Sequence, residues 1–377
     1  MKRTLTFGLL AAILCTLTAC QSQQPAEQTA ANAVQETTTT EPSEPAVDLL
    51  DEMVGSMTTE EKVGQLFFTR CPDVEAAATA AKYHLGGYIL FGRDFEDLTA
   101  EQVKENIQSY QKASAIPMLI GVDEEGGTVV RASYYLREEP FLSPRDYYAD
   151  GGWEAVELAE KEKAELLLSL GINVNLAPVC DVTGNEESFM YDRSFSGDAD
   201  EVSRFVSETV GIYKSLHLGS TLKHFPGYGD NEDTHTGIAV DDRSYSEFLT
   251  TDFKPFQAGI AAGADCVLVS HNIVNCIDEA YPASLSEKVH QTLRKDLNFN
   301  GVVMTDDLIM EAITEYTGSD TAAVFAVKAG NDMLCCSDLE TQYPAVLQAV
   351  NRQEIPMEQI DQSVKRILRW KQNIGLI

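Results

Sequence analysis

The sequence is short of basic side chains. Its 377 residues contain 28 Lys and Arg against 59 Asp and Glu, which gives a formal net charge of −31. Binding to nucleic acid phosphates requires clustered Lys and Arg, so this balance argues against a nucleic acid partner. The acidic excess favours solubility. Apolar and charged fractions of 44% and 23% are typical of a folded globular protein.

Several site signatures are also missing. No Gly-x-Gly-x-x-Gly follows the first predicted strand, so a dinucleotide site is not indicated. No Cys-x-x-Cys or other zinc spacing is present, and we expect neither a metal nor a cofactor. The cysteines beyond residue 20 lie mostly in or beside apolar runs, which predicts buried free thiols rather than disulfides; they are Cys71, Cys180, Cys266, Cys276, Cys335 and Cys336.

The first 47 residues resemble a targeting segment. Lys2 and Arg3 precede a short apolar run, and the run ends in Leu17-Thr-Ala-Cys20. This pattern predicts a lipoprotein signal peptide over residues 1–19, with Cys20 as the lipidated residue; a plain secretory signal is the alternative. Residues 20–47 are rich in Gln, Thr, Ala and Pro, which predicts a disordered tether. We therefore expect a body at 48–377, outside the cytoplasm and anchored to the membrane.

The body alternates helical patterns with short apolar runs. A capping box formed by Thr58 and Glu61 predicts the start of a helix. Continuous apolar runs at this spacing indicate parallel strands covered on both faces. We predict an α/β fold with a single (β/α)8 TIM-type barrel, and a doubly wound open sheet is the alternative. The eight runs are 65–68, 87–91, 118–123, 172–179, 221–225, 266–271, 301–306 and 332–336.

Polar side chains follow these runs. In barrels the C-terminal ends of the strands carry the active site, so these residues predict a pocket. They are Arg93, Asp123, Asp181, Lys223 with His224, His271 and Asp306.

One stretch concentrates groups that can carry protons. Lys223 and His224 end a strand-like run, and a Gly- and acid-rich loop then leads to Asp233 and His235. Histidine is suited to proton transfer near neutral pH.

Three motifs carry a resemblance to a known family: Gly121-Val-Asp-Glu-Glu-Gly-Gly127, Lys223-His-Phe-Pro-Gly-x-Gly229 with Asp233-Thr-His235, and Thr305-Asp-Asp-Leu308. The chain resembles glycoside hydrolase family 3 in its single-domain β-N-acetylhexosaminidase branch, from Met57 to Leu376. The resemblance implies an exo-acting retaining enzyme that cleaves terminal N-acetylglucosamine from peptidoglycan fragments or chitin-type oligosaccharides. An oligosaccharide or muropeptide is the expected partner, and we expect a monomer.

The resemblance also implies the catalytic roles. Asp306 matches the nucleophile, because a carboxylate can form and release a glycosyl ester. Asp307 is its rival, but adjacent strand residues point to opposite faces, so only one is expected to face the pocket. A helix N-cap is the structural alternative for Asp306. His235 matches the acid/base, oriented by Asp233.

Substrate-binding positions carry over residue by residue. Asp123, Arg131, Arg193, Lys223 and His224 match groups that hold sugar hydroxyls. Salt bridges from the two arginines to Asp123 or Asp181 are the alternative. His271 is assigned either to the pocket lining or to the core. The motif commonly has a second His where this chain has Tyr228, a departure that puts the loop conformation and pH profile in doubt.

Three other functions compete with the retaining hexosaminidase. A phosphorylase would use Arg131, Arg193 and Lys223 to hold phosphate. A metal-dependent hydrolase would use histidines and Asp306, although no His-x-His follows the first strand. A non-catalytic sugar-binding lipoprotein would show binding without turnover.

Overall fold

The computed structural model describes residues 49–231, 237, 239–310, 313, 316–317 and 321–377. The predicted signal peptide, Cys20, the tether, Asp233 and His235 lie outside these residues.

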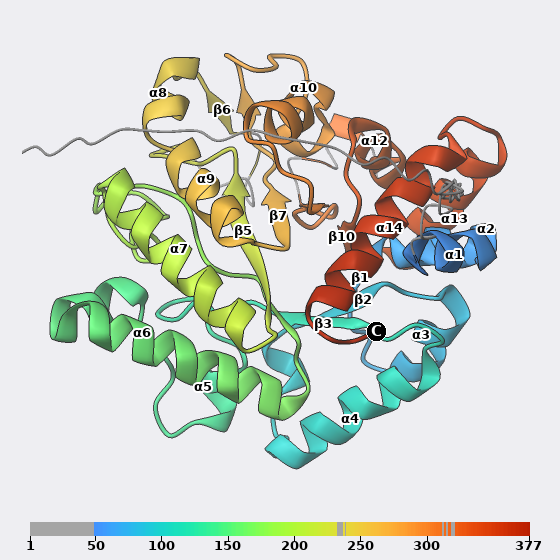
Figure 1. The fold of residues 1–377 in the computed structure, drawn as a ribbon, viewed down its shortest axis with the longest axis horizontal. Helices are drawn as coiled ribbons and strands as arrows, with labels where there is room; N and C mark the ends of the chain where they lie inside the picture. Colours follow the sequence, from blue (N-terminus) through green and yellow to red (C-terminus); the bar gives the residue numbers. More distant parts are fainter. Residues whose placement is uncertain (1–48, 232–236, 238, 311–312, 314–315, 318–320) are drawn as a thin grey trace, which may run out of the picture. The chain divides into compact units, whose positions relative to one another are not determined.

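Eight parallel strands form the central sheet, in the order β10-β1-β2-β3-β4-β5-β7-β9 (Figure 1). The ring is closed between the outer two strands by a parallel bridge from Met304 to Met333. Each predicted apolar run overlaps one of these strands, so the barrel is confirmed. They are β1 (Phe67–Arg70), β2 (Gly87–Leu90), β3 (Leu119–Val122), β4 (Val174–Asn175), β5 (Gly219–Phe225), β7 (Cys266–Val269), β9 (Val302–Thr305) and β10 (Leu334–Cys336).

Two further strands, β6 (Val240–Asp241) and β8 (Ile273–Val274), pair with each other in a separate small sheet. Each is two residues long, too short to leave a periodic signal in the sequence.

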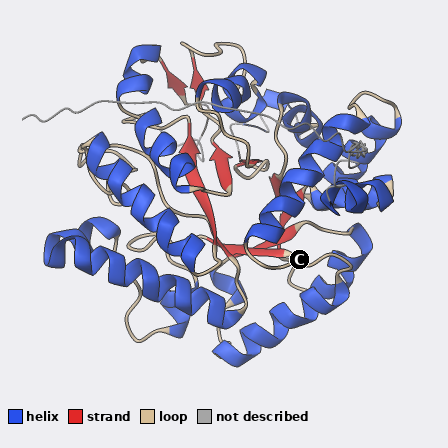
Figure 2. Ribbon diagram, viewed as in Figure 1, coloured by secondary structure: helices blue, strands red, loops and turns tan. Residues whose placement is uncertain are grey.

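Helices connect consecutive barrel strands and surround the sheet (Figure 2). The predicted capping box is present, because the Glu61 amide donates to the Thr58 hydroxyl and the Thr58 amide donates to the Glu61 carboxylate. The helices are α1 (Leu49–Ser56), α2 (Thr59–Gln65), α3 (Ala76–Tyr83), α4 (Ala100–Ala113), α5 (Ala132–Leu136), α6 (Pro144–Leu170), α7 (Ala199–Ser215), α8 (Tyr245–Thr250), α9 (Phe253–Ala262), α10 (Glu287–Gln291), α12 (Ala322–Ala329), α13 (Leu339–Asn351) and α14 (Met357–Asn373). No described helix is both long and apolar enough to cross a membrane.

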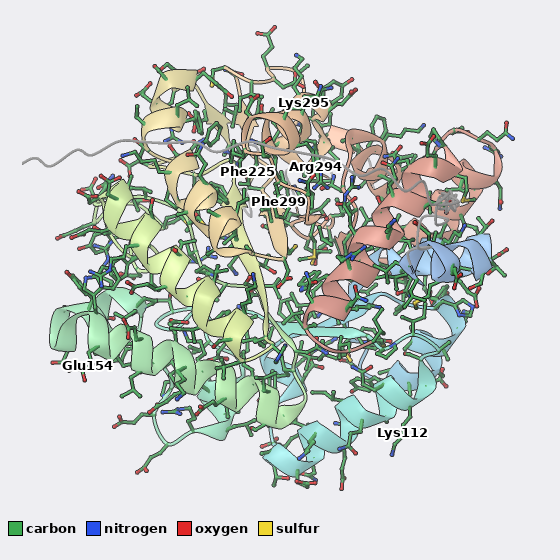
Figure 3. All side chains as sticks on the ribbon, in the orientation of Figure 1. Lys112, Glu154, Phe225, Arg294, Lys295 and Phe299 are labelled. Carbon is green, nitrogen blue, oxygen red and sulfur yellow. The ribbon has the colours of Figure 1, made fainter. Side chains whose placement is uncertain are left out.

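The core lies between the sheet and the helices. Figure 3 shows Lys112 and Glu154 on the outer helices α4 and α6, whereas Phe225 and Phe299 belong to a buried aromatic cluster. Five of the six described cysteines are buried and all six are free thiols, as predicted; Cys276 is the exposed exception.

Candidate active site

A cavity of about 400 Å³ lies at the C-terminal ends of the barrel strands. Parallel strands in a closed barrel all end at the same rim, so residues far apart in the chain meet there. Six of the side chains assigned from the sequence line this cavity: Asp123, Arg131, Arg193, Lys223, His224 and Asp306.

A carboxylate that the sequence reasoning missed connects the cations of this cavity. Glu125 accepts two hydrogen bonds from Arg193, at 2.9 and 2.8 Å, and its carboxylate lies 2.6 Å from the Lys223 ammonium. Lys223 also donates to Asp123 at 2.5 Å. Arg193 therefore pairs with Glu125, and not with Asp123 or Asp181 as the alternative from the sequence supposed.

Electrostatics keep this network ionised. Burial disfavours the charged form of Glu125, but Arg193 and Lys223 outweigh it and hold the pKa of this carboxyl well below its usual range. Burial also opposes the charge on Lys223, while Asp123 and Glu125 raise its pKa above the ordinary value. A fixed set of charges thus lines one side of the cavity.

His224 is oriented by groups on both ring nitrogens. Nδ1 lies 2.8 Å from the Asp181 carboxylate, and Nε2 lies 3.0 Å from Nη2 of Arg193. A guanidinium only donates, so Nε2 accepts and the ring proton is on Nδ1, bonded to Asp181. Burial alone would raise the pKa of Asp181. His224 and the other groups that donate to this carboxylate outweigh burial, so its pKa lies below the ordinary value.

The Asp181 carboxylate also holds the chain beyond β5. Its second oxygen accepts from the Tyr228 amide at 2.8 Å. The Tyr228 ring is buried and packs edge-on against Phe189 and His224. This residue, which stands where the family motif commonly has His, therefore supports the cavity wall and does not line the cavity.

A second missed carboxylate, Glu124, positions Arg131. It is fully buried and accepts from the amides of Arg131 and Ala132, at 3.0 and 2.7 Å, and from the Ser133 hydroxyl. These are the free amides at the start of α5, which a carboxylate satisfies well. The Arg131 guanidinium donates to the Val130 carbonyl at 3.0 Å.

Asp306 and Asp307 both line the cavity, so the expectation that only one could face it is wrong. The reason is that β9 ends at Thr305, and strand alternation does not extend into the following turn. Their hydrogen bonds distinguish the two carboxylates. Asp307 accepts from the Ser337 amide and hydroxyl, whereas Asp306 accepts from the Asp307 amide at 2.8 Å.

Arg243 holds the described end of the loop that leads to Asp233 and His235. Its guanidinium donates to Asp241 at 2.7 Å, to Asp252 at 2.9 Å and to the Gly227 carbonyl at 3.2 Å. Gly227 and Gly229 both have positive φ, and a Cβ on either would overlap this ion-pair cluster. Only glycine fits these positions.

Three predicted rim residues lie outside the cavity: Asp181, which is buried behind His224, Arg93 and His271. Arg93 pairs with Asp73 and lines a neighbouring cavity. His271 is fully buried, with Nδ1 2.7 Å from the Ser284 hydroxyl and Nε2 3.1 Å from the Asp307 carbonyl. Among the described residues, no three His, Cys, Asp or Glu side chains are placed to hold a metal ion.

Residues 58–370 match the family described as Glycosyl hydrolase family 3 N terminal domain. The chain belongs to this family. Within it, the chain is 33% identical over 313 residues to a beta-hexosaminidase of Idiomarina loihiensis, covering 76% of this chain and 91% of the relative. A beta-hexosaminidase of Stenotrophomonas maltophilia is 37% identical over 257 residues, covering 66% and 75%.

Solved structures give the same family assignment. The glycoside hydrolase family 3 beta-N-acetylglucosaminidase of Paenibacillus aligns with a TM-score of 0.80 and 32% identity, over 85% of this chain and 63% of that one. A beta-N-acetylhexosaminidase of Beutenbergia cavernae aligns with a TM-score of 0.75 and 25% identity, over 84% and 99%.

Proposed function

We propose that this family 3 protein is an exo-acting, retaining β-N-acetylhexosaminidase. It removes terminal N-acetylglucosamine from peptidoglycan fragments or chitin-type oligosaccharides. The observation that carries the proposal is that Asp306 lines one cavity together with Asp123, Arg193, Lys223 and His224. The beta-hexosaminidase relatives in Idiomarina and Stenotrophomonas support the same function.

Asp306 is the nucleophile of this proposal. Its carboxylate attacks the anomeric carbon, the bond to the leaving oxygen breaks, and a glycosyl ester forms. Water then displaces Asp306 from the opposite face, so the configuration is retained. The Asp307 amide bonds to Oδ1 of Asp306 at 2.8 Å and fixes the orientation of the carboxylate.

His235 is the proposed acid/base. It gives a proton to the leaving oxygen in the first step and takes one from water in the second. Asp233 holds the imidazole tautomer, as a buried Asp does in a hydrolase triad. Both residues lie outside the described part of the chain, so their roles rest on the motif that joins them to Lys223 and His224.

The sugar-binding side chains offer alternating donors and acceptors. Lys223 and Arg193 are held by carboxylates, and Asp123 lies beside the ammonium of Lys223 at 2.5 Å. Charged donors and acceptors in fixed positions suit the directional hydrogen bonds of a polyhydroxyl ligand. Arg131 adds donors from the start of α5.

The same charge balance favours hydrolysis over phosphorolysis. Two of the three cations that would hold phosphate, Arg193 and Lys223, already pair with Glu125 and Asp123. An incoming phosphate dianion would also meet the carboxylates of Asp123 and Glu125, which remain charged while Asp306 is a neutral glycosyl ester. Water, which is neutral, has no such repulsion to overcome.

The N-terminal sequence supports a location of this protein outside the cytoplasm. The proposal assigns residues 1–19 to a signal peptide, Cys20 to lipidation, 20–47 to the tether and 48–377 to the catalytic body. Metabolic labelling with an alkynyl fatty acid tests it: wild-type protein takes up label, and Cys20→Ala does not.

The activity test compares nitrophenyl β-N-acetylglucosaminide with the β-glucoside. We expect wild type to cleave the acetamido sugar, Asp306→Ala to lose turnover and His235→Ala to be badly weakened, while the exposed control Asp150→Ala is unaffected. Azide should restore turnover in Asp306→Ala and yield a glycosyl azide of inverted configuration, because it replaces the missing nucleophile. Sugar 1-phosphate formed on addition of phosphate would overturn hydrolysis, and binding without turnover would overturn the enzyme.

A further inference from the structure

A cavity of about 570 Å³ lies at the other end of the barrel from the catalytic cavity. Its lining includes residues 263–265, which directly precede β7, and Asn300 and Gly301, which directly precede β9. These residues mark the N-terminal ends of the strands, whereas the active site of a barrel lies at the C-terminal ends. No residue of this cavity takes part in the proposed hydrolysis.

This basic cavity is lined by four Lys and Arg side chains and by one carboxylate, that of Asp265. The four are Lys214, in the last turn of α7, and Lys365, Arg366 and Arg369 on α14. The whole chain has 59 acids against 28 bases, so the balance of charge is reversed here. A local excess of positive charge on an acidic protein indicates a negatively charged partner.

Two of these cations contact carboxylates and still remain able to bind an anion. Arg366 shares the buried carboxylate of Asp332 with Arg294, so one negative charge faces two positive ones. Lys365 pairs with Asp51 at 2.6 Å, and these side chains are 35% and 56% exposed. An exposed pair of this kind contributes little to stability, so the ammonium can exchange Asp51 for another anion at little cost.

The other two cations, Lys214 and Arg369, are exposed to solvent. A Cβ on Gly263 would overlap the Lys214 ammonium, so this cation lies against the C-cap of α9, where the helix dipole favours a positive charge. The carboxylate of Asp265 accepts from Asn373 at 3.3 Å and lies in the field of Lys214. An approaching anion thus meets two solvent-exposed cations at the basic cavity.

The folded body begins beside this cavity. α1 starts at Leu49 and packs against α14 (Figure 1), and Asp51 on α1 bonds to Lys365. A chain that precedes Leu49 therefore joins the body next to one of the four cations. The proposed tether, residues 20–47, would span roughly 30 Å as a flexible chain. This length keeps the basic cavity within reach of the membrane that holds the lipid on Cys20.

We propose that the N-terminal face of the barrel docks on the membrane, and that the basic cavity binds the phosphate of an anionic phospholipid headgroup there. This inference rests on the lipid anchor of the proposed function, which confines the body to the membrane surface. The catalytic cavity lies at the opposite end of the barrel. Docking through the basic cavity therefore turns the active site away from the membrane and leaves it open to substrate.

Docking of this kind requires only a weak site. The tether makes the contact intramolecular, with an effective lipid concentration on the order of millimolar. Each Lys or Arg at an anionic membrane surface favours binding about fivefold. The acidic remainder of the chain is repelled by the same surface, so orientations that present other faces are disfavoured. The basic cavity therefore decides which face of the body meets the membrane.

The test is a lysine footprint of the full lipoprotein in vesicles. The protein, lipidated at Cys20, is incorporated into vesicles of phosphatidylcholine, either alone or mixed with phosphatidylglycerol, and treated with an amine-reactive label. Peptide mass spectrometry then gives the labelling rate of each lysine. We expect the labelling of Lys214 and Lys365 to slow on the anionic vesicles only. Lys161 on α6 and Lys254 at the start of α9 should label at the same rate on both.

A double variant tests the role of the exposed cations. Lys214→Gln with Arg369→Gln should lower the docking equilibrium constant about 25-fold, since each cation contributes about fivefold, and Lys365 should lose its protection. Lys161→Gln with Lys254→Gln removes the same charge elsewhere and should keep the protection. Both variants should cleave nitrophenyl β-N-acetylglucosaminide as wild type does, which shows that they are folded. Raising the salt concentration should release the protection in wild type.

Three outcomes would overturn the proposal. The first is equal labelling of Lys214 and Lys365 on the neutral and the anionic vesicles. The second is equal protection by soluble glycerophosphoglycerol at the same phosphate concentration, which would assign the cavity to a free phosphodiester. The third is a chain that takes up no lipid at Cys20, because the anchor would then be absent. Failure to cleave the nitrophenyl sugar would overturn the proposed activity and leave the footprint as it is, so the two failures are distinguishable.

Discussion

The substitution Glu125→Gln tests whether the buried charge network supports both stability and binding. The glutamine has nearly the same shape but only one acceptor oxygen, and its other end becomes an NH2 donor. Lys223 and Arg193, which can only donate, both approach the Glu125 carboxylate within 3 Å. One of them must therefore face another donor in the variant, although Lys223 keeps Asp123.

The expected cost follows from burial. The side chain of Glu125 is 4% exposed, and those of Lys223 and Arg193 are 3% and 15% exposed. Removing one partner of a buried pair costs about 3–5 kcal/mol. The unfolding entropy of a body of about 330 residues is roughly 0.7 kcal/mol/K, so the Tm should fall by about 4–7 °C.

Differential scanning calorimetry at neutral pH measures this shift, with Glu157→Gln on the exposed face of α6 as the control. The KM for the nitrophenyl sugar should also rise, since Arg193 and Lys223 lose their alignment. A Tm for Glu125→Gln equal to that of wild type and of the control would refute the reasoning, because it would mean that the two cations need no buried carboxylate.

Three other perturbations have expected outcomes. The pKa values of Glu125 and Asp181 are lowered in the fold from ordinary values of 4.5 and 3.8. The stability that these two carboxylates contribute is therefore present above about pH 4.5 and is lost as the pH falls below it. The urea midpoint of unfolding should drop in this acidic range, and it should drop less steeply in Glu125→Gln. Burial lowers the pKa of Lys371 from 10.5 to about 7. Between these two pH values the unfolded state binds one more proton than the folded state, so the unfolding free energy should rise with pH. Lys371→Met should flatten this rise, and an unchanged pH slope in the variant would contradict the prediction. Arg243→Met leaves Asp241 and Asp252 without their cation, and the unfolding free energy from urea titration should fall by about 3–5 kcal/mol, whereas an unchanged midpoint would argue against this ion-pair cluster.

The barrel was predictable because its strands are buried on both faces. Such strands are nearly continuous apolar runs, and each of the eight runs overlaps a strand. The two-residue strands β6 and β8 were not predictable, since neither is long enough to show a period and, unlike the equally short β4, neither lies in an apolar run as long as 172–179. The capping box at Thr58 was predictable because it depends on residues three positions apart.

The chain alone predicted the site where a residue stands at a strand end, and the family motifs added Arg131 and Arg193. Asp123 and Asp306 immediately follow β3 and β9, and the fold alone brings them to the same rim. Glu125 lies in the same motif as Asp123, but its role depends on Arg193, 68 positions further along the chain. Such a partner becomes visible only when the barrel has closed.

The pairing of charges argues for where selectivity resides in this enzyme. Inside the catalytic cavity, Arg193 and Lys223 are matched by Glu125 and Asp123, so their donors orient hydroxyl groups without attracting an anion strongly. Recognition of the terminal sugar then depends on geometry, because each matched pair fixes the direction of its hydrogen bonds. The terminal sugar is therefore recognised by the fixed directions of these donors and acceptors, and not by charge.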